Sequence, residues 1–145
     1  MADLATFTNY LVSPVGLDNY VLPPASQIIT DAFNYALDIV HPFIASVSTV
    51  QYDLAVYGLG ADYVINYAQD QPGRLTFATL RNDFHINQFT PGVVGSTSNA
   101  QTASGLTVPT AMQGLQIGDL QNLKTPWGRQ YLQIAQMVGP DMGLS

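Results

Sequence analysis

The chain has 145 residues and a mass of 15.6 kDa, which is the size of a single domain with one buried core. Charged residues make up 10% of it, against roughly 25% in an average soluble domain, and the formal net charge is −6. The acidic balance argues against proteins that hold nucleic acid through Lys and Arg, and the absence of cysteine excludes disulfides and thiolate metal sites.

The shortage of charged residues means that the surface of the folded chain carries few charges. Soluble surfaces normally mix both signs of charge at roughly a quarter to a third of their positions. We therefore expect much of the exterior to be covered by copies of the chain or by partners. The alternative is a monomer kept soluble by its Asn, Gln, Ser and Thr side chains.

A membrane role is not expected. The N-terminus, MADLATFTNYLVSPVG, has no basic region and no long apolar core, and no run of eighteen apolar residues occurs in the chain. The sequence therefore predicts neither a secretory signal nor a membrane span.

Residues 1–25 contain Pro14, Gly16 and the pair Pro23-Pro24, which interrupt regular structure. We expect this segment to be an extended N-terminal arm that lies against something else. Residues 26–145 are expected to form a single helical domain. The arm also carries Tyr10 and Tyr20, which we take as candidate contacts to neighbouring subunits or partners.

Apolar residues then recur at helical spacing in three stretches, residues 28–40, 47–68 and 75–84. Ser26 is placed to cap the first helix, and Pro42 is placed to end it. The third stretch is expected to keep Leu75, Ala78 and the aromatic pair Phe77 and Phe84 on one side.

The second of these helices carries four tyrosines. Tyr52 and Tyr63 point away from Tyr57 by helical geometry, so one apolar face does not account for all four. We expect two buried faces, one internal and one between subunits, and Tyr52 and Tyr63 join the candidate contacts.

Residues 90–109, TPGVVGSTSNAQTASGLTVP, have no helical period and carry three glycines. They predict a β-hairpin or a long loop, and long ordered loops usually serve a contact. A merely flexible surface loop is the alternative. The candidate contact residues of this segment are Val93, Val94, Leu106 and Val108.

A last helix is expected from Pro126, with Thr125 as its cap and Gly139-Pro140 as its end. Trp127, Tyr131, Ala135 and Val138 form its predicted stripe, and Asp119 is placed to cap a short preceding turn. The candidate anchors of the last helix are Thr125, Pro126, Trp127 and Tyr131. The expected fold is mainly α, a small bundle of about four helices with the long central loop or β-hairpin.

No catalytic pattern meets its spacing requirement. Asp38 and His41 lie one turn apart on a predicted helix, but a polar helix end ahead of Pro42 explains them better. Gly58-Leu59-Gly60 lies inside an apolar helix with no preceding strand, which favours close helix packing over dinucleotide binding. We expect no enzyme activity, no cofactor and no metal.

Three segments resemble the head-to-tail adaptor, or head-completion, proteins of tailed bacteriophages. DLQNLKTPWGRQYLQIAQ at 119–136 is similar to the C-terminal segment of that family, and DLAVYGLGADYVINYA at 53–68 is similar to its central helix. LRNDF followed by PGVVGSTS resembles its third helix and glycine-rich loop. The likeness covers roughly residues 26–139.

The resemblance implies a virion protein in the neck of a tailed phage, assembled in the host cytoplasm. Copies of such a subunit, commonly twelve, form a dodecamer ring docked on the portal, which extends the DNA channel and provides the surface for tail attachment. The partners are then the chain itself, the portal and a tail or tail-terminator protein, while genomic DNA passes during ejection without specific binding. Two other functions stay open, a strand-rich tail-terminator or minor tail-ring protein, and a small helical hydrolase or ligand-binding domain.

Overall fold

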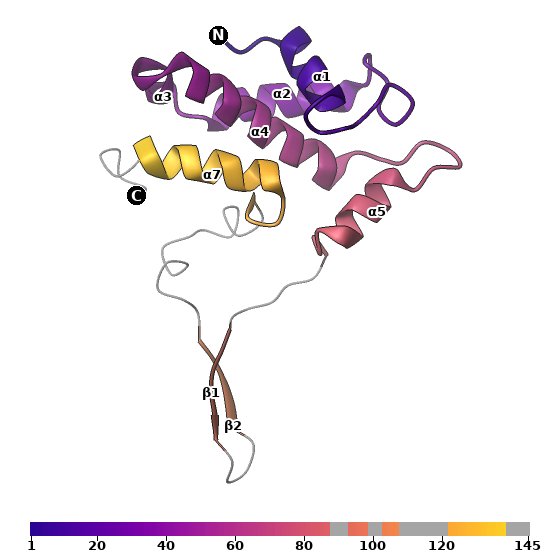
Figure 1. The fold of residues 1–145 in the computed structure, drawn as a ribbon. Helices are drawn as coiled ribbons and strands as arrows, with labels where there is room; N and C mark the ends of the chain where they lie inside the picture. The colour runs from indigo at the N-terminus through magenta and orange to yellow at the C-terminus, as the bar shows by residue number, and fades with distance from the viewer. Residues whose placement is uncertain (88–92, 99–102, 108–121, 139–145) are drawn as a thin grey trace.

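The computed structural model describes residues 1–87, 93–98, 103–107 and 122–138, and this part of the chain is mainly helical, as predicted. The elements, in chain order, are α1 (Leu4–Val12), α2 (Gln27–Ile39), α3 (Phe43–Val47), α4 (Thr49–Tyr67), α5 (Thr76–Asp83), β1 (Val93–Ser98), β2 (Ala103–Thr107) and α7 (Pro126–Val138) (Figure 1).

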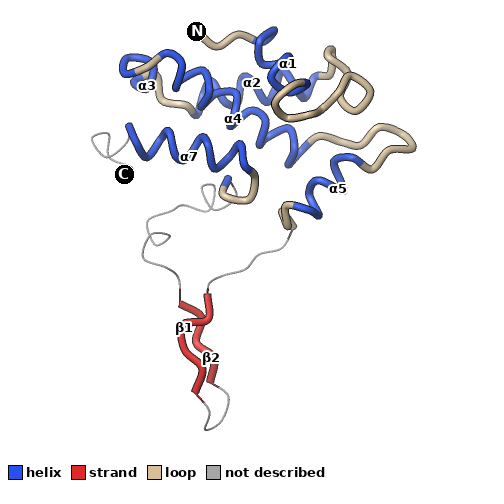
Figure 2. Tube along the Cα trace, in the orientation of Figure 1, coloured by secondary structure: helices blue, strands red, loops and turns tan. Residues whose placement is uncertain are grey.

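Helix α4 is the centre of the helical body, and the other described helices pack around it (Figure 2). It confirms the predicted second helix but begins two residues later, at Thr49, and the Ser48 side chain accepts a hydrogen bond from the Gln51 N–H at its start. Ten of its residues between 55 and 65 are buried. A helix whose central turns are buried around the full circumference is a core helix, so the other described helices are placed by their contact with α4.

The prediction of an extended N-terminal arm is wrong for α1. Asp3 caps this helix by accepting a hydrogen bond from the Thr6 N–H at 2.9 Å, and Phe7 and Leu11 are buried one turn apart. The prolines come only after Val12, so they end the helix without preventing it. Leu17 and Leu22 are also buried, and the segment is part of the core.

Helix α2 confirms the first predicted helix. Ser26 stands at its N-cap position, but the serine side chain makes no capping hydrogen bond. Pro42 follows the end of α2 as predicted, and it also opens α3, a short helix that periodicity did not indicate. Val47 belongs to α3 and not to the helix after it.

Helix α5 confirms the third predicted helix, although its buried side differs. The carboxylate of Asp70 accepts hydrogen bonds from the N–H groups of Phe77, at 2.6 Å, and Ala78, at 3.0 Å, at the start of the helix. Phe77 is fully buried, whereas Leu75 is exposed, so Leu75 and Phe77 do not share an apolar face.

Strands β1 and β2 pair antiparallel, with Val93 opposite Thr107 and an irregularity between Val94 and Ser96. The remaining residues of the predicted hairpin or loop at 90–109 lie outside the described part of the chain. Asp119 and Gly139-Pro140 lie outside it as well.

The last helix begins at Pro126 and ends at Val138, as predicted for its start. Its buried residues are Gly128, Leu132 and Ile134, while Trp127 and Tyr131 are half-buried. The predicted stripe therefore lies along the edge of the face that packs on α4.

Candidate functional site

The residues first weighed for catalysis do not form a site in the described structure. Asp38 and His41 are both exposed, and His41 Nδ1 accepts a hydrogen bond from the Phe43 N–H at 3.2 Å. His41 thus stabilises the start of α3. Within residues 1–87 and the other described ranges, no three His or Asp side chains gather where they could hold a metal ion.

The Gly58-Leu59-Gly60 fragment lies inside α4, where its glycines allow close packing. A Cβ on Gly58 would lie 2.9 Å from the carbonyl oxygen of Trp127, and one on Gly60 would lie 2.8 Å from Cζ of Phe7. Both distances are shorter than real side chains adopt, so α7 and the Phe7 ring approach α4 only because these positions lack a side chain.

The polar centre of the molecule is a buried carboxyl between α4 and α7. The Thr125 hydroxyl donates to Asp62 Oδ1, and Asn66 Nδ2 donates to Asp62 Oδ2 at 3.0 Å. Thr125 Oγ1 in turn accepts the Gly128 N–H at 3.0 Å. A Cβ on Gly128 would lie 2.8 Å from Asp62 Oδ1 and would collide with the carbonyl of Asn122.

Burial raises the pKa of Asp62 to about 6, against the lowering effect of the hydrogen bonds from Thr125 and Asn66. A perturbed carboxyl often marks an active site, but a substrate has to reach it. Asp62 is 3% exposed and Thr125 is 0% exposed, so neither side chain meets solvent. We therefore regard this cluster as a structural junction that fixes α7 on α4.

All four cationic side chains contact other parts of the same chain. Arg74 lies over the Tyr20 ring, Arg81 donates to the carbonyls of Ile65 and Ala68, Lys124 donates to the carbonyl of Ile86, and Arg129 donates to the carbonyl of Leu123. The Arg81 contacts lie at the C-terminal end of α4, where helix carbonyls lack partners within the helix. Positive charge is thus already engaged within the chain, while most of the described aspartates lie at the surface.

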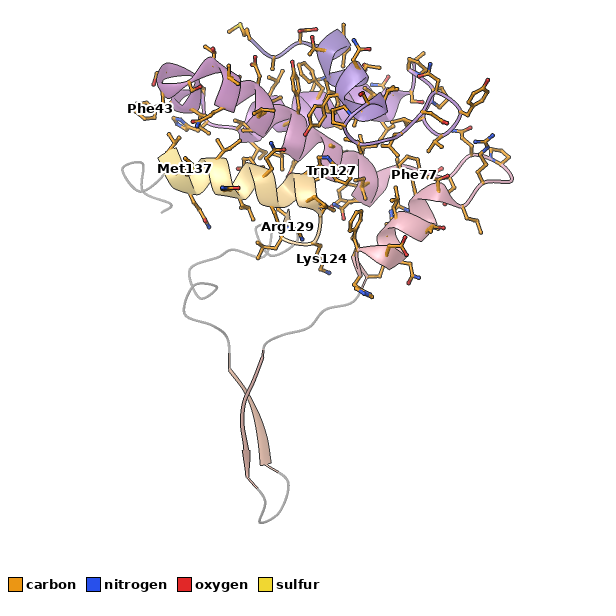
Figure 3. All side chains as sticks on the ribbon, viewed as in Figure 1. Phe43, Phe77, Lys124, Trp127, Arg129 and Met137 are labelled. Carbon is orange, nitrogen blue, oxygen red and sulfur yellow. The ribbon has the colours of Figure 1, made fainter. Side chains whose placement is uncertain are left out.

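One end of the helical body exposes large apolar side chains. Phe43 and Met137, from α3 and α7, lie at the same end of the molecule (Figure 3). We define the apolar end by its members, each between 43% and 66% exposed: Ile39, Phe43, Val47, Val50 and Met137. None of the five carries a charge. Four of them, Ile39, Phe43, Val47 and Val50, lie close together along the chain, from the end of α2 to the start of α4, and exposed apolar patches mark contact sites in soluble proteins.

The predicted contact tyrosines have different surroundings. Tyr10 donates a hydrogen bond to Gln130 Oε1 at 3.2 Å and so links α1 to α7, and burial raises its pKa. Tyr20 is exposed, whereas Tyr52 and Tyr63 are half-buried. Among the loop candidates, Val93 and Val94 lie in β1 and Leu106 in β2, and Val108 lies outside the described residues.

The four candidate anchors all lie at the start of α7. Thr125 is its cap, Pro126 its first residue, and Trp127 meets the Phe84 ring edge-on with ring centroids 6.0 Å apart. Tyr131 packs, half-buried, against the core. Thr125 links the last helix to Asp62 of α4, and Trp127 links it to Phe84, the residue after α5.

Reasoning from the sequence missed the Asp62 junction, the role of Gly128 and the apolar end. A signal for the Asp62 junction was present, because Asp62 is the single acid within an apolar run, GLGADYVI.

Comparison with protein-family models, with curated proteins and with solved structures finds no match to the chain. In the described part of the chain, no helix is both long enough and apolar enough to cross a bilayer.

Proposed function

We propose that the chain is a structural virion protein of a tailed bacteriophage, a head-to-tail adaptor whose copies form a ring between portal and tail. The ring extends the DNA channel and offers the surface on which the tail attaches. Its partners are other copies of itself, commonly twelve in all, the portal, and a tail or tail-terminator protein.

The observation that carries this proposal is the apolar end. Two copies that each bear a net charge of −6 repel one another, so association is easiest where no charge lies. Ile39, Phe43, Val47, Val50 and Met137 are exposed and uncharged, and covering them releases water from apolar area. The scarcity of charge over the whole chain is in keeping with lateral burial.

A closed ring needs two different surfaces on each subunit, because a head-to-tail contact repeats around an axis. The apolar end supplies one of them. The second is expected among the exposed Tyr20 and the strand residues Val93, Val94 and Leu106, which lie in other elements.

The negative net charge of the chain favours a ring through which DNA passes over a ring that binds DNA. The four cationic side chains contact the subunit itself, and a ring of twelve copies at −6 each carries about −72. A lumen lined with aspartates repels the phosphate backbone, so DNA slides through without specific binding.

The competing functions have less support. A tail-terminator protein is expected to be rich in strand, whereas the described chain is mainly helical. A hydrolase needs titratable groups that a substrate can reach. The perturbed carboxyl of Asp62 is buried, and His41 bonds the backbone of α3.

The experiment is co-sedimentation with portal-bearing heads of the same phage, combined with sedimentation velocity of the assembled particle. Val50→Asp places a charge in the apolar end, and we expect at least tenfold weaker incorporation. Leu75→Asp is the matched control, since Leu75 is similarly exposed but lies outside the apolar end, at the N-cap of α5. Absence of the wild-type chain from portal-bearing particles would contradict the adaptor function, and equal loss in both variants would contradict the role of the apolar end.

A further inference from the structure

Three tyrosine rings form an open aromatic surface across α2 and α4. The Tyr63 ring lies between the other two, with its centroid 4.9 Å from that of Tyr35 and 4.7 Å from that of Tyr67. Tyr35 is 41% exposed and Tyr67 is 61% exposed. Rings that served only the core would be buried like Tyr57, so this row of rings has area left for a contact.

Two exposed carboxylates flank the row of rings on α2. Asp31 lies four residues before Tyr35 and Asp38 three residues after it, so both are neighbours of Tyr35 on the helix surface. Asp31 Oδ1 accepts a hydrogen bond from Gln27 Nε2 at 2.9 Å, which holds that carboxylate on the helix. We call these five residues, Asp31, Tyr35, Asp38, Tyr63 and Tyr67, the tyrosine face.

The exposed carboxylates of Asp31 and Asp38 make the surroundings of the tyrosine face negative. Burial raises the pKa of the Tyr35 hydroxyl, so this side chain stays a neutral phenol near neutral pH. The two carboxylates attract a cation. Aromatic ring faces add to that attraction, because their quadrupole is negative above and below the ring.

We propose that the tyrosine face binds an arginine-bearing segment of another protein, with a guanidinium group over the exposed tyrosine rings and within reach of Asp31 and Asp38. A guanidinium stacks on aromatic rings and forms paired hydrogen bonds to carboxylates, so it matches both components of the face. Tyrosine and arginine are also the residues that most often dominate binding energy at protein interfaces.

A second copy of the chain does not fit this surface. Its cationic side chains are Arg74, Arg81, Lys124 and Arg129, and each already contacts its own subunit. A neighbouring copy would bring mostly aspartates to a negative face. The occupant is therefore a different protein, and the inference does not depend on ring formation through the apolar end.

The test uses a fluorescent octa-arginine peptide as the probe and the full chain, with fluorescence anisotropy as the measurement. We expect Tyr35→Ala/Tyr67→Ala to weaken binding about tenfold, as the loss of two exposed cation–π contacts implies. Tyr35→Phe/Tyr67→Phe keeps both rings and should bind within about twofold of the wild type. Tyr20→Ala removes an exposed ring outside the face, and the same weakening should not appear.

Two results would overturn the proposal. If the double alanine variant binds the peptide like the wild type while circular dichroism shows it folded, the peptide is held only by the net negative charge. If that variant instead loses self-association, the face belongs between copies of the chain. The single variant Tyr67→Ala, at the exposed end of α4, repeats the measurement with the smallest disturbance of packing. Loss of ring formation in Val50→Asp leaves the peptide result unchanged, so the two proposals fail separately.

Discussion

Helix α4 is held on two sides by two different kinds of contact. Towards α1 and α2 the contact is apolar and aromatic, with the Phe7 ring stacked 5.6 Å from Phe33 and 6.0 Å from Tyr57. Towards α7 the centre of the contact is polar, with the Asp62 carboxyl bonded to Thr125.

The difference separates the contacts that stabilise the fold from the contacts that fix the position of a helix. Burial of apolar area stabilises roughly in proportion to the area and does not depend on pH near neutrality. A buried polar contact contributes little net free energy, but it is costly when one partner is changed, because the other is left unsatisfied. The aromatic side should therefore dominate the free energy of unfolding, and the polar side should fix the position of α7 and make stability depend on pH.

The largest effect is expected on the aromatic side. Phe7→Ala removes a fully buried ring and should lower the free energy of unfolding by about 4 kcal/mol. Phe43→Ala is the matched control, since Phe43 lies partly exposed at the apolar end, and it should cost less than about 1 kcal/mol. Urea denaturation of both variants measures the difference, and equal losses would mean that Phe7 is not a core residue.

The next effect is a pH dependence from the polar side. The folded-state pKa of Asp62 is raised from 3.8 to about 6, so the folded chain holds this proton more tightly than the unfolded chain. The stabilisation is fully present below pH 3.8 and is lost as the pH rises through about 6, by up to about 3 kcal/mol. Denaturation between pH 4 and pH 7 should therefore show stability falling with increasing pH.

Asp62→Asn removes the titrating proton and keeps the shape of the side chain. This variant should lose the slope between pH 4 and pH 7, whereas Asp38→Asn, on the exposed surface of α2, should retain it. Hydrogen bonds with Thr6 lower the pKa of Asp3. This carboxylate therefore makes stability fall as the pH decreases below 3.8, which is the opposite direction to the effect of Asp62. A slope that survives in Asp62→Asn would show that another group is responsible.

The helices of this fold were largely predictable from the sequence. Apolar spacing located α2, α4, α5 and α7, and the Thr125-Pro126 pair marked the start of the last one. Helix α1 was missed because Pro14 and Pro23-Pro24 were expected to prevent a helix in the residues before them as well. Asp3 and the Phe7–Leu11 spacing were the stronger local signals.

The candidate sites were much less predictable, because they form only in three dimensions. Thr125 lies 63 residues from Asp62, and an apolar pattern on all sides of α4 gives no indication of which helix covers the acid. The tyrosine face likewise joins Tyr35 of α2 to two tyrosines of α4. The apolar end combines residues of four helices, none of which is conspicuous within its own segment.

The smallest effect compares the two glycines of α4, which face its two sides. Alanine at either position gains about 1 kcal/mol of helix propensity, and each new Cβ meets a neighbour below 3 Å. At Gly58 that neighbour is the backbone oxygen of Trp127, whereas at Gly60 it is the far end of the Phe7 side chain, which can shift more easily than backbone. Gly58→Ala should cost about 2 kcal/mol net and Gly60→Ala about 1 kcal/mol. Only Gly58→Ala displaces α7, so only that variant should also change the dependence of stability on pH that is due to Asp62. Equal pH slopes in both variants would contradict the conclusion that the Asp62 contact depends on the position of α7.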